Sequence, residues 1–295
     1  MSSAVAPPPD GSRAQAPDAR VEVAGIPLGA GCPLVLIAGP CVIEDEAVMK
    51  RAAGGLREIC RGLGVPLIFK SSYEKDNRGK PTGYGGPGLD KGLEELARVR
   101  REVGVPVLSD VHRECDVRAA AEVLDILQIP AYLCQQTSLV LEVGSAGKTV
   151  NVKKGQFLAP EDMKSAVEKL RHVGNERVLL TDRGTCFGYH RLVFDVRSVQ
   201  IMKTLGCPVV VDPTHIVRIY GKPSSDPSGG EPEYVHTLAR AGVAAGANAL
   251  FIETHPDPFK AACDAASMIR LGDQLPLLLD QVRPLAEAVR EQGLA

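Results

Sequence analysis

Short apolar runs alternate with longer amphipathic segments along most of the chain. The apolar runs are typical of strands buried on both faces, and the segments between them repeat their hydrophobic positions with the period of a helix. Eight runs are expected to be strands: 34–38, 66–69, 106–108, 126–129, 149–152, 177–180, 208–211 and 249–252. Helices are expected at residues 44–63, 89–103, 160–172 and 233–245.

Eight strand–helix repeats in 295 residues predict an α/β fold, the (β/α)8 TIM barrel, whose usual size is about 250 residues. Residues 20–23 and 26–28 are expected to form a short N-terminal β-hairpin that closes the bottom of the barrel. The alternative, an open doubly wound sheet, needs a GxGxxG turn after its first strand, where residues 39–41 read Gly-Pro-Cys. We therefore predict one catalytic barrel domain over residues 20–295, preceded by a disordered, proline-rich tail at 1–19.

Cationic side chains follow several of the predicted strands. In a barrel of this kind the chemistry lies at the carboxyl ends of the strands, so these positions are the candidates for an active site. The cations are Lys70, Lys75, Lys153 and Arg183. Holding four cations at one rim is costly unless anions lie among them, which predicts an anionic substrate such as a phosphate or a carboxylate. Alternatively, the cations pair with Asp110, Asp182 and Asp212.

Alternation along a strand separates two neighbouring lysines. Successive side chains point to opposite faces of a sheet, so Asn151 and Lys153 should point into the barrel while Val152 packs against the helices. Lys153 is therefore a stronger site candidate than Lys154.

A second set of residues has the side chains of a divalent metal site. Its members are Cys41, His215, Glu253 and Asp264. They follow the first, seventh and eighth strands, which are neighbours when a barrel closes. A mixed sulfur, nitrogen and oxygen set suits Zn, Fe, Mn or Co. The alternatives for Cys41 are a buried packing residue or a nucleophile that would need a histidine base.

Composition narrows the class of protein. With 44% hydrophobic residues the chain can bury a full core, and a net charge of −2 with 4% aromatic residues argues against nucleic acid as a partner. The eight cysteines include no CxxC pair, and we find neither a secretory signal nor an apolar run of about 18 residues. We expect a soluble cytoplasmic protein whose seven cysteines other than Cys41 are reduced packing residues.

The polar segments together resemble those of the 3-deoxy-D-manno-octulosonate 8-phosphate synthase family. The resemblance runs from about residue 30 to 290 and rests on order and spacing as well as on single motifs. The segments are Ala38-Gly39-Pro40-Cys41, Phe69-Lys70-Ser71-Ser72-Tyr73-Glu74-Lys75, Asp110-Val111-His112, 151–157 (NVKKGQF), Asp182-Arg183-Gly184, Phe187-Gly188-Tyr189, Thr214-His215 and 253–258 (ETHPDP).

The resemblance implies a fold, a reaction and a set of roles. Members of the family are (β/α)8 barrels, usually homotetramers, that condense phosphoenolpyruvate with arabinose 5-phosphate and release phosphate. The implied substrate-binding residues are Lys70, Lys75, Asn77, Arg78, Lys153, Gln156 and Arg183, the implied catalytic residues are Lys70, Lys75, Asp110 and His215, and the implied metal ligands are Cys41, His215, Glu253 and Asp264. Cys41 implies the metal-dependent branch, because the other branch has asparagine there.

The segments that the resemblance assigns to the acceptor sugar depart from the family pattern. Residues 75–80 read Lys-Asp-Asn-Arg-Gly-Lys where the family has Lys-Ala-Asn-Arg-Ser-Ser, and Gln135 stands where it has arginine. Gly85 also replaces an arginine, and Ala265-Ala266 replaces Gly-Pro after Asp264. Either Lys80 or Arg218 takes over the contact with the acceptor phosphate, or the acceptor is a different or unphosphorylated sugar.

Two further functions stay open at this point. One is a sister carboligase, a 3-deoxy-D-arabino-heptulosonate 7-phosphate synthase that uses erythrose 4-phosphate and shares the same metal set. The other is a barrel that binds phosphoenolpyruvate without turnover, which only the altered acceptor segment favours.

Overall fold

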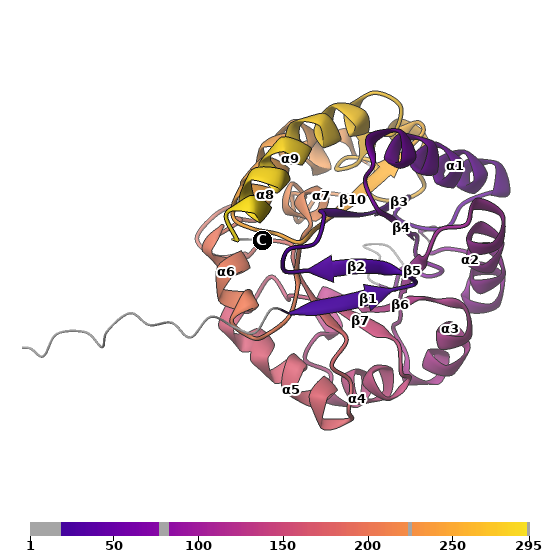
Figure 1. Ribbon diagram of the computed structural model, residues 1–295. Coiled ribbons are helices and arrows are strands. Elements are labelled where there is room, and N and C mark those ends of the chain that lie inside the picture. The colour runs from indigo at the N-terminus through magenta and orange to yellow at the C-terminus, as the bar shows by residue number, and fades with distance from the viewer. Residues whose placement is uncertain (1–18, 77–82, 224–225, 294–295) are drawn as a thin grey trace, which may run out of the picture.

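Eight parallel strands close into a barrel in this computed structural model, which describes residues 19–76, 83–223 and 226–293. The strands are β3 (Val35–Gly39), β4 (Leu67–Lys70), β5 (Val107–Asp110), β6 (Ile126–Ile129), β7 (Thr149–Lys153), β8 (Val178–Asp182), β9 (Val209–Val211) and β10 (Ala249–His255). Because β10 pairs with both β9 and β3, the sheet has no break (Figure 1). The predicted (β/α)8 barrel is confirmed, and the open sheet is wrong.

Helices follow the strands and surround the barrel (Figure 1). They are α1 (Glu46–Leu63), α2 (Leu89–Val103), α3 (Val117–Val123), α4 (Thr137–Ser145), α5 (Lys164–His172), α6 (Arg197–Lys203), α7 (Pro213–Ile216), α8 (Val235–Ala244) and α9 (Gln274–Glu291). Short 3-10 turns lie at Glu114–Asp116, Ala131–Leu133, Pro160–Met163, Pro227–Gly229, Pro232–Tyr234 and Pro258–Lys260. Local chemistry explains why α1 starts two residues later than predicted: the Asp45 side chain accepts a hydrogen bond from the Val48 amide and so caps the helix.

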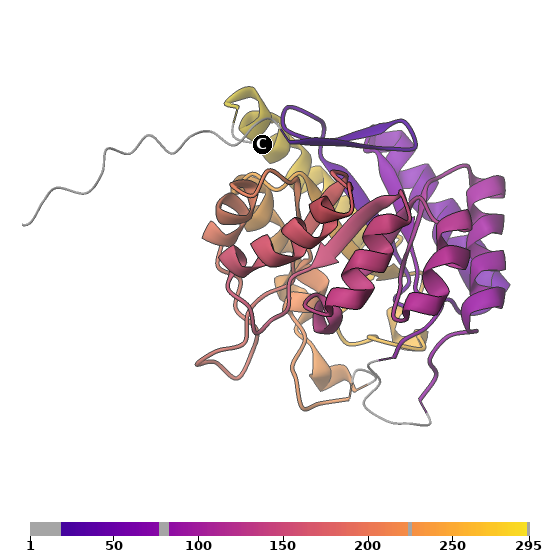
Figure 2. The same ribbon diagram turned by 90° about the horizontal axis from the view of Figure 1, so that it is seen from below.

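An antiparallel hairpin of β1 (Arg20–Val23) and β2 (Ile26–Gly29) lies across one end of the barrel (Figures 1 and 2). Its buried side chains Val21, Val23 and Leu28 belong to one apolar cluster with inward-facing residues of the strands, including Ile68 and Leu108. The hairpin therefore plugs the barrel with hydrophobic side chains, as predicted. A second, larger cluster fills the space between the strands and the helices.

Several strands continue past the apolar runs that predicted them. The segments expected to end at Phe69, Leu108 and Ile252 instead end at Lys70, Asp110 and His255. Lys70 pairs with Leu108, Asp110 with Gln128 and His255 with Arg270, so the ladder does not stop where hydrophobicity does. The ionisable groups consequently lie on rigid strands and not on loops.

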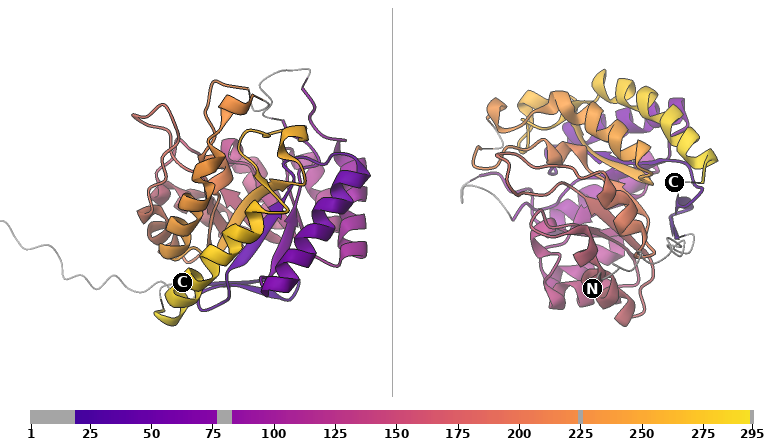
Figure 3. Two further views of the ribbon diagram at one scale, coloured as in Figure 1. Left: turned by 90° about the horizontal axis from the view of Figure 1, so that it is seen from above. Right: turned by 90° about the vertical axis from the view of Figure 1, so that its left-hand side faces the viewer.

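The long loops gather at the end of the barrel opposite the hairpin (Figures 2 and 3). One of them carries a two-residue strand, β11 (Ile269–Arg270), that extends the sheet beside β10. No helix in the described parts of the chain is long and apolar enough to cross a membrane. The predicted tail lies almost wholly outside the described residues, so the domain boundary at residue 20 stays a prediction.

Candidate active site

The barrel interior changes from apolar to polar along its axis. In β4 the inward-facing Ile68 belongs to the apolar cluster that includes the hairpin, called here the lower apolar cluster. Lys70, two residues later, faces a layer of polar side chains nearer the carboxyl ends of the strands, called here the polar layer. In β5 the same step leads from Leu108 to Asp110. Because alternate residues share a face, β4 and β5 each contribute one side chain to the plug and the next inward one to the site.

A chain of hydrogen bonds crosses four neighbouring strands in the polar layer. Thr181 Oγ1 donates to Asn151 Oδ1 at 2.7 Å, and Asn151 Nδ2 donates to Gln128 Oε1 at 2.8 Å. Gln128 Nε2 in turn donates to Asp110 Oδ1 at 2.5 Å, and Ser72 also donates to this carboxylate. All five side chains are buried, so the chain fixes the orientation of Asp110.

Lys70 and Lys75 share two buried carboxylates. Lys70 Nζ lies 3.3 Å from Glu253 Oε1 and donates to the Cys41 carbonyl at 2.9 Å. Lys75 Nζ lies 3.8 Å from Asp110 Oδ2 and 3.9 Å from Glu253 Oε1. Burial disfavours the charged carboxylate, but Lys75 and Lys70 outweigh it and hold the pKa of Asp110 well below its usual value. The alternative that these cations pair with strand-end acids is therefore correct for both lysines.

Lys153 points into the barrel, as alternation predicted. Its Nζ lies 2.5 Å from Asp212 Oδ2 and 4.0 Å from the centre of the Phe251 ring. Val152, by contrast, belongs to the cluster between the strands and the helices. Lys154 points away from the site, because its Nζ donates to carbonyl oxygens of the surrounding loops and to Thr185 Oγ1.

Arg183 is buried without a carboxylate partner. Its Nη1 donates to the hydroxyl of Tyr220 at 2.6 Å and to Gln156 Oε1 at 3.3 Å. Within the described residues no Asp or Glu oxygen lies within 4.0 Å of this guanidinium, although it is only 5% exposed. Asp182 does not pair with it and instead accepts a hydrogen bond from the Gly184 amide. A buried cation whose partners are all neutral favours the binding of an anion, because its charge is otherwise uncompensated.

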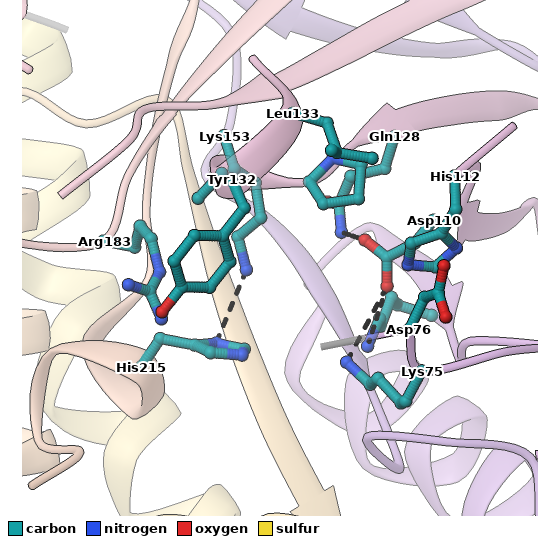
Figure 4. A pocket seen from close by; sticks show the side chains of 13 residues that line it. Lys75, Asp76, Asp110, His112, Gln128, Tyr132, Leu133, Lys153, Arg183 and His215 are labelled. Atoms are coloured by element: carbon teal, nitrogen blue, oxygen red, sulfur yellow. Dashed lines mark hydrogen bonds and ion pairs between the residues drawn. The ribbon is translucent and has the colours of Figure 1, made fainter. Parts of the chain in front are cut away.

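These groups line one cavity at the carboxyl ends of the strands (Figure 4). Lys153, Arg183, His215 and Tyr132 lie on one side, and Lys75 and Asp110 face them from the other (Figure 4). Lys70, Asp76, His112, Gln128 and the segment 130–133 complete the lining. The cavity thus joins the four predicted cations to Asp110 and to His215.

The four predicted metal-ligating residues converge beside this cavity. Ligand atoms of His215, Glu253 and Asp264 lie within 4.8 Å of one another, and Cys41 Sγ lies 3.0 Å from Asp264 Oδ2. Glu253 is fully buried, and its Oε2 atom has no hydrogen-bond partner within the part of the chain that the structure describes. An orphaned carboxylate oxygen in such a cluster fits a missing cation, since a buried charge is otherwise costly.

His215 is oriented for a ligand role. Asp212 Oδ2 lies 2.7 Å from its Nδ1, which leaves Nε2 facing Glu253 Oε1 at 3.7 Å. Burial lowers the pKa of His215, so the neutral imidazole that binds metals is favoured. Burial, together with Cys263 and Asp264, raises the pKa of the Cys41 thiol well above its usual value. A bound cation would reverse that shift.

Not every sequence expectation is met. Asn77, Arg78 and Lys80 lie outside the described residues, and Gln156 contacts Arg183 without lining the cavity. Only Cys60, Cys134 and Cys207 behave as the expected buried packing cysteines; Cys115 and Cys186 are exposed, and Cys32 and Cys263 are half-buried. These four residues lie in or beside loops, where no strand or helix period could indicate burial.

Sequence reasoning missed Gln128 and Tyr220. A glutamine inside the apolar run 126–129 was a signal for an inward polar position, because a buried polar side chain needs partners. Tyr220 lies in an irregular loop whose path only the tertiary structure defines, so no signal was available.

Arg218, one of two candidates for the acceptor phosphate, lies beside the metal-ligating group. Its Nη1 is 3.4 Å from Asp264 Oδ1, and its side chain is only 13% exposed. It therefore lies beside the metal-ligating residues.

Comparisons with known proteins agree with this geometry. The model of the DAHP synthetase I family matches residues 14–288. A protein named 2-dehydro-3-deoxyphosphooctonate aldolase from Geobacter sp. strain M21 is 49% identical over 271 residues, which cover 92% of this chain and 98% of that protein. Proteins of the same name from Trichlorobacter lovleyi and Acidithiobacillus ferrooxidans are each 50% identical, over 92% and 88% of this chain and 98% and 92% of theirs.

Proposed function

The chain belongs to the DAHP synthetase I family and, within it, to the 2-dehydro-3-deoxyphosphooctonate aldolases, and from this premise we propose its substrates, its metal and its residue roles. The reaction joins C3 of phosphoenolpyruvate to the aldehyde carbon of arabinose 5-phosphate. Water adds at C2, and phosphate leaves, giving 3-deoxy-D-manno-octulosonate 8-phosphate.

The buried guanidinium of Arg183 is the main observation that supports phosphoenolpyruvate as a substrate. Among the described residues this guanidinium has Tyr220 and Gln156 as hydrogen-bond partners, and Lys153 lies on the same side of the cavity. A planar fork and a point charge side by side match a ligand with a phosphate and a carboxylate. Lys70 and Lys75 hold the other end of the same ligand from β4 and the loop after it. Asn77 and Arg78 keep the substrate-binding role that the family resemblance implies.

The acceptor sugar binds between Asp110 and the metal-ligating group. Lys75 and Lys70 hold Asp110 ionised, and the hydrogen-bond chain through Gln128 orients it, so that its oxygens can accept hydrogen bonds from sugar hydroxyls. Arg218 lies at the edge of this space and is free to contact the acceptor phosphate when Asp264 binds a cation. This arrangement keeps arabinose 5-phosphate as the acceptor despite Gln135.

A single divalent ion fits among Cys41, His215, Glu253 and Asp264. The orphaned Glu253 Oε2 and the neutral His215 both favour a cation there, and the donor set suits Zn, Fe, Mn or Co. When bound, the ion would polarise the acceptor carbonyl as a Lewis acid. Lys70 donates to the Cys41 carbonyl and lies 3.3 Å from Glu253, so it joins the metal-ligating residues to the phosphoenolpyruvate side.

An aldose screen tests the acceptor. Metal-loaded enzyme is incubated with phosphoenolpyruvate and, separately, arabinose 5-phosphate, erythrose 4-phosphate or unphosphorylated arabinose, and phosphate release is followed. We expect release only with arabinose 5-phosphate. Turnover with another aldose and none with arabinose 5-phosphate would move the acceptor assignment to that sugar, and release with none of them would refute the proposed reaction.

We also propose that the enzyme is a cytoplasmic homotetramer. Phe157, Phe187 and Tyr189 are 52%, 89% and 72% exposed on two loops that the bond from the Cys186 amide to the Gln156 carbonyl joins. Exposed aromatic groups on adjoining loops favour contact with a second copy of the chain. Light scattering coupled to gel filtration should give a molecular mass four times that of the chain. The variant Phe187→Ser should give a lower mass, because it weakens the contact between copies.

A further inference from the structure

A second cysteine lies at the proposed metal-ligating group. The thiol of Cys263, the thiol of Cys41 and a carboxylate oxygen of Asp264 lie within 4.8 Å of one another. Asp264 also belongs to the group with His215 and Glu253. The two groups therefore share Asp264, which places Cys263 beside the four residues already assigned.

The backbone around Cys263 is shaped to present it there. Asp264 adopts a left-handed conformation with φ of 51°, which aspartate tolerates better than most residues. The Ser267 amide and hydroxyl both donate to the Asp264 carbonyl, and the Ala262 amide donates to Glu44 Oε1. The loop is thus tied to the segment that follows Cys41, and two consecutive side chains turn toward one point.

We propose that Cys263 is a fifth protein ligand of the metal, so that the ion is held by two thiolates as well as His215, Glu253 and Asp264. This inference rests on the metal site of the proposed function. Donor atoms bound to one ion at about 2.0–2.3 Å lie at most about 4.6 Å apart. Within each of the two groups the donor atoms lie within 4.8 Å of one another, and Asp264 joins the groups. The unpartnered Oε2 of buried Glu253 points independently to a cation at the same place.

The surrounding charge supports a second thiolate. Arg218 stands 3.4 Å from Asp264, and Lys75 and Lys70 lie within 4.0 Å of Glu253. These cations would repel a divalent ion held by a single thiolate and two carboxylates, and an additional anionic donor offsets that repulsion. Two soft sulfur donors also favour Zn or Co over Mn.

Cobalt spectroscopy tests this ligand without any measure of turnover. Reduced, metal-free enzyme is titrated anaerobically with Co²⁺, and the near-ultraviolet thiolate-to-cobalt charge-transfer absorption is recorded at saturation. Because this absorption scales with the number of cobalt–sulfur bonds, Cys263→Ser and Cys41→Ser should each lose about half of it, and the double variant all of it. Cys186→Ser, which changes an exposed cysteine near the rim, is the matched control and should keep the full band.

The outcomes separate this inference from the proposed function. A half-intensity band in Cys263→Ser would come from the bond between Cys41 and cobalt. It would therefore show that this variant still forms the metal site. An unchanged band in this variant would overturn the Cys263 assignment and leave the four-residue site intact, whereas wild-type enzyme without any thiolate band would also refute Cys41 as a ligand. X-ray absorption of the zinc-loaded wild type, which depends on no variant, should count two sulfur neighbours, and a count of one would overturn the proposal.

Discussion

The two sides of the cavity are incomplete in opposite ways. On the β7–β8 side, buried Arg183 has a phenol and an amide as partners and no acid. On the β9–β10–β3 side, Glu253 and Asp264 converge with His215, and one carboxylate oxygen of Glu253 has no partner. The first side needs an anion and the second a cation. Under the proposed function, the barrel thus separates the recognition of phosphoenolpyruvate from that of the metal and the acceptor.

Removal of the metal should have the largest effect on activity of the changes considered, because it affects one side of the cavity and leaves the other intact. A chelator is expected to reduce phosphate release to background, because the β10–β3 side then lacks its cation. The variant Cys41→Asn is expected to retain partial activity that the chelator does not affect, since family members with asparagine there need no metal. Phosphate release with and without chelator measures both.

The control for that experiment is Cys115→Asn, which changes an exposed cysteine remote from the cluster and should leave chelator sensitivity intact. Full wild-type activity in the presence of chelator would contradict the metal assignment. Complete inactivity of Cys41→Asn with normal folding would instead favour a nucleophilic Cys41.

Replacing the buried guanidinium should damage the anion side alone. Arg183→Ala is expected to lower kcat/KM for phosphoenolpyruvate by a factor on the order of 10²–10³, and Arg183→Lys by less, because lysine keeps the charge without the fork. Steady-state kinetics at varied phosphoenolpyruvate measures the loss. Arg191→Ala, an exposed arginine on the same loop, is the control and should stay near wild type.

Metal content should be unchanged in Arg183→Ala, since no metal-ligating residue contacts this side chain. A variant that loses its metal and keeps its KM for phosphoenolpyruvate would show that the two sides are not independent.

Arg218 distinguishes the two substrates. Arg218→Gln is expected to raise KM for arabinose 5-phosphate about tenfold, as for a lost charge-assisted hydrogen bond, and to leave KM for phosphoenolpyruvate unchanged. Bisubstrate kinetics on metal-saturated enzyme gives both constants. Arg270→Gln, a half-exposed position that pairs with Asp273, is the control. A parallel rise in both KM values would count against an acceptor role.

Mutation at the hairpin end of the barrel should lower the stability of the protein and leave its KM values unchanged, whereas mutation in the cavity should change the kinetic constants. Leu28→Ala removes a fully buried side chain from the lower apolar cluster and is expected to cost about 2–5 kcal/mol of unfolding free energy. Its KM values at 25 °C should stay within about twofold of wild type, since Leu28 belongs to the lower apolar cluster and does not line the cavity. Denaturant unfolding and kinetics measure the two effects.

Glu22→Ala, an exposed position on the same hairpin, should change neither quantity. A large change in KM for Leu28→Ala would show that the plug and the site are coupled.

Hydrophobic period predicted the fold because the eight barrel strands are buried on both faces and a helix lies between each strand and the next. The rule that the chemistry of a barrel lies at the carboxyl ends of its strands then predicted Lys70, Lys153 and Arg183 as site residues. The closed barrel brings these three side chains to one cavity. It could not predict which cations pair with acids. That depends on distances across the barrel, such as the 2.5 Å between Lys153 and Asp212.

Loop residues were harder to predict than strand residues. Cys263 gave no periodic signal, and its position depends on the left-handed turn at Asp264 and on the anchor at Glu44. Tyr220 similarly reaches Arg183 from a loop that follows α7. Side chains on irregular segments are placed by contacts distant in sequence, which composition and spacing do not record.

The pairing of β10 with β3 has a consequence for the order of events during synthesis. Cys41 leaves the ribosome early, whereas Asp264, to which its thiol is hydrogen-bonded, follows 223 residues later. The first and last strands of the barrel must meet before these side chains can bind one ion. Uptake of the proposed metal would therefore follow closure of the barrel, and an occupied site would show that the barrel has closed.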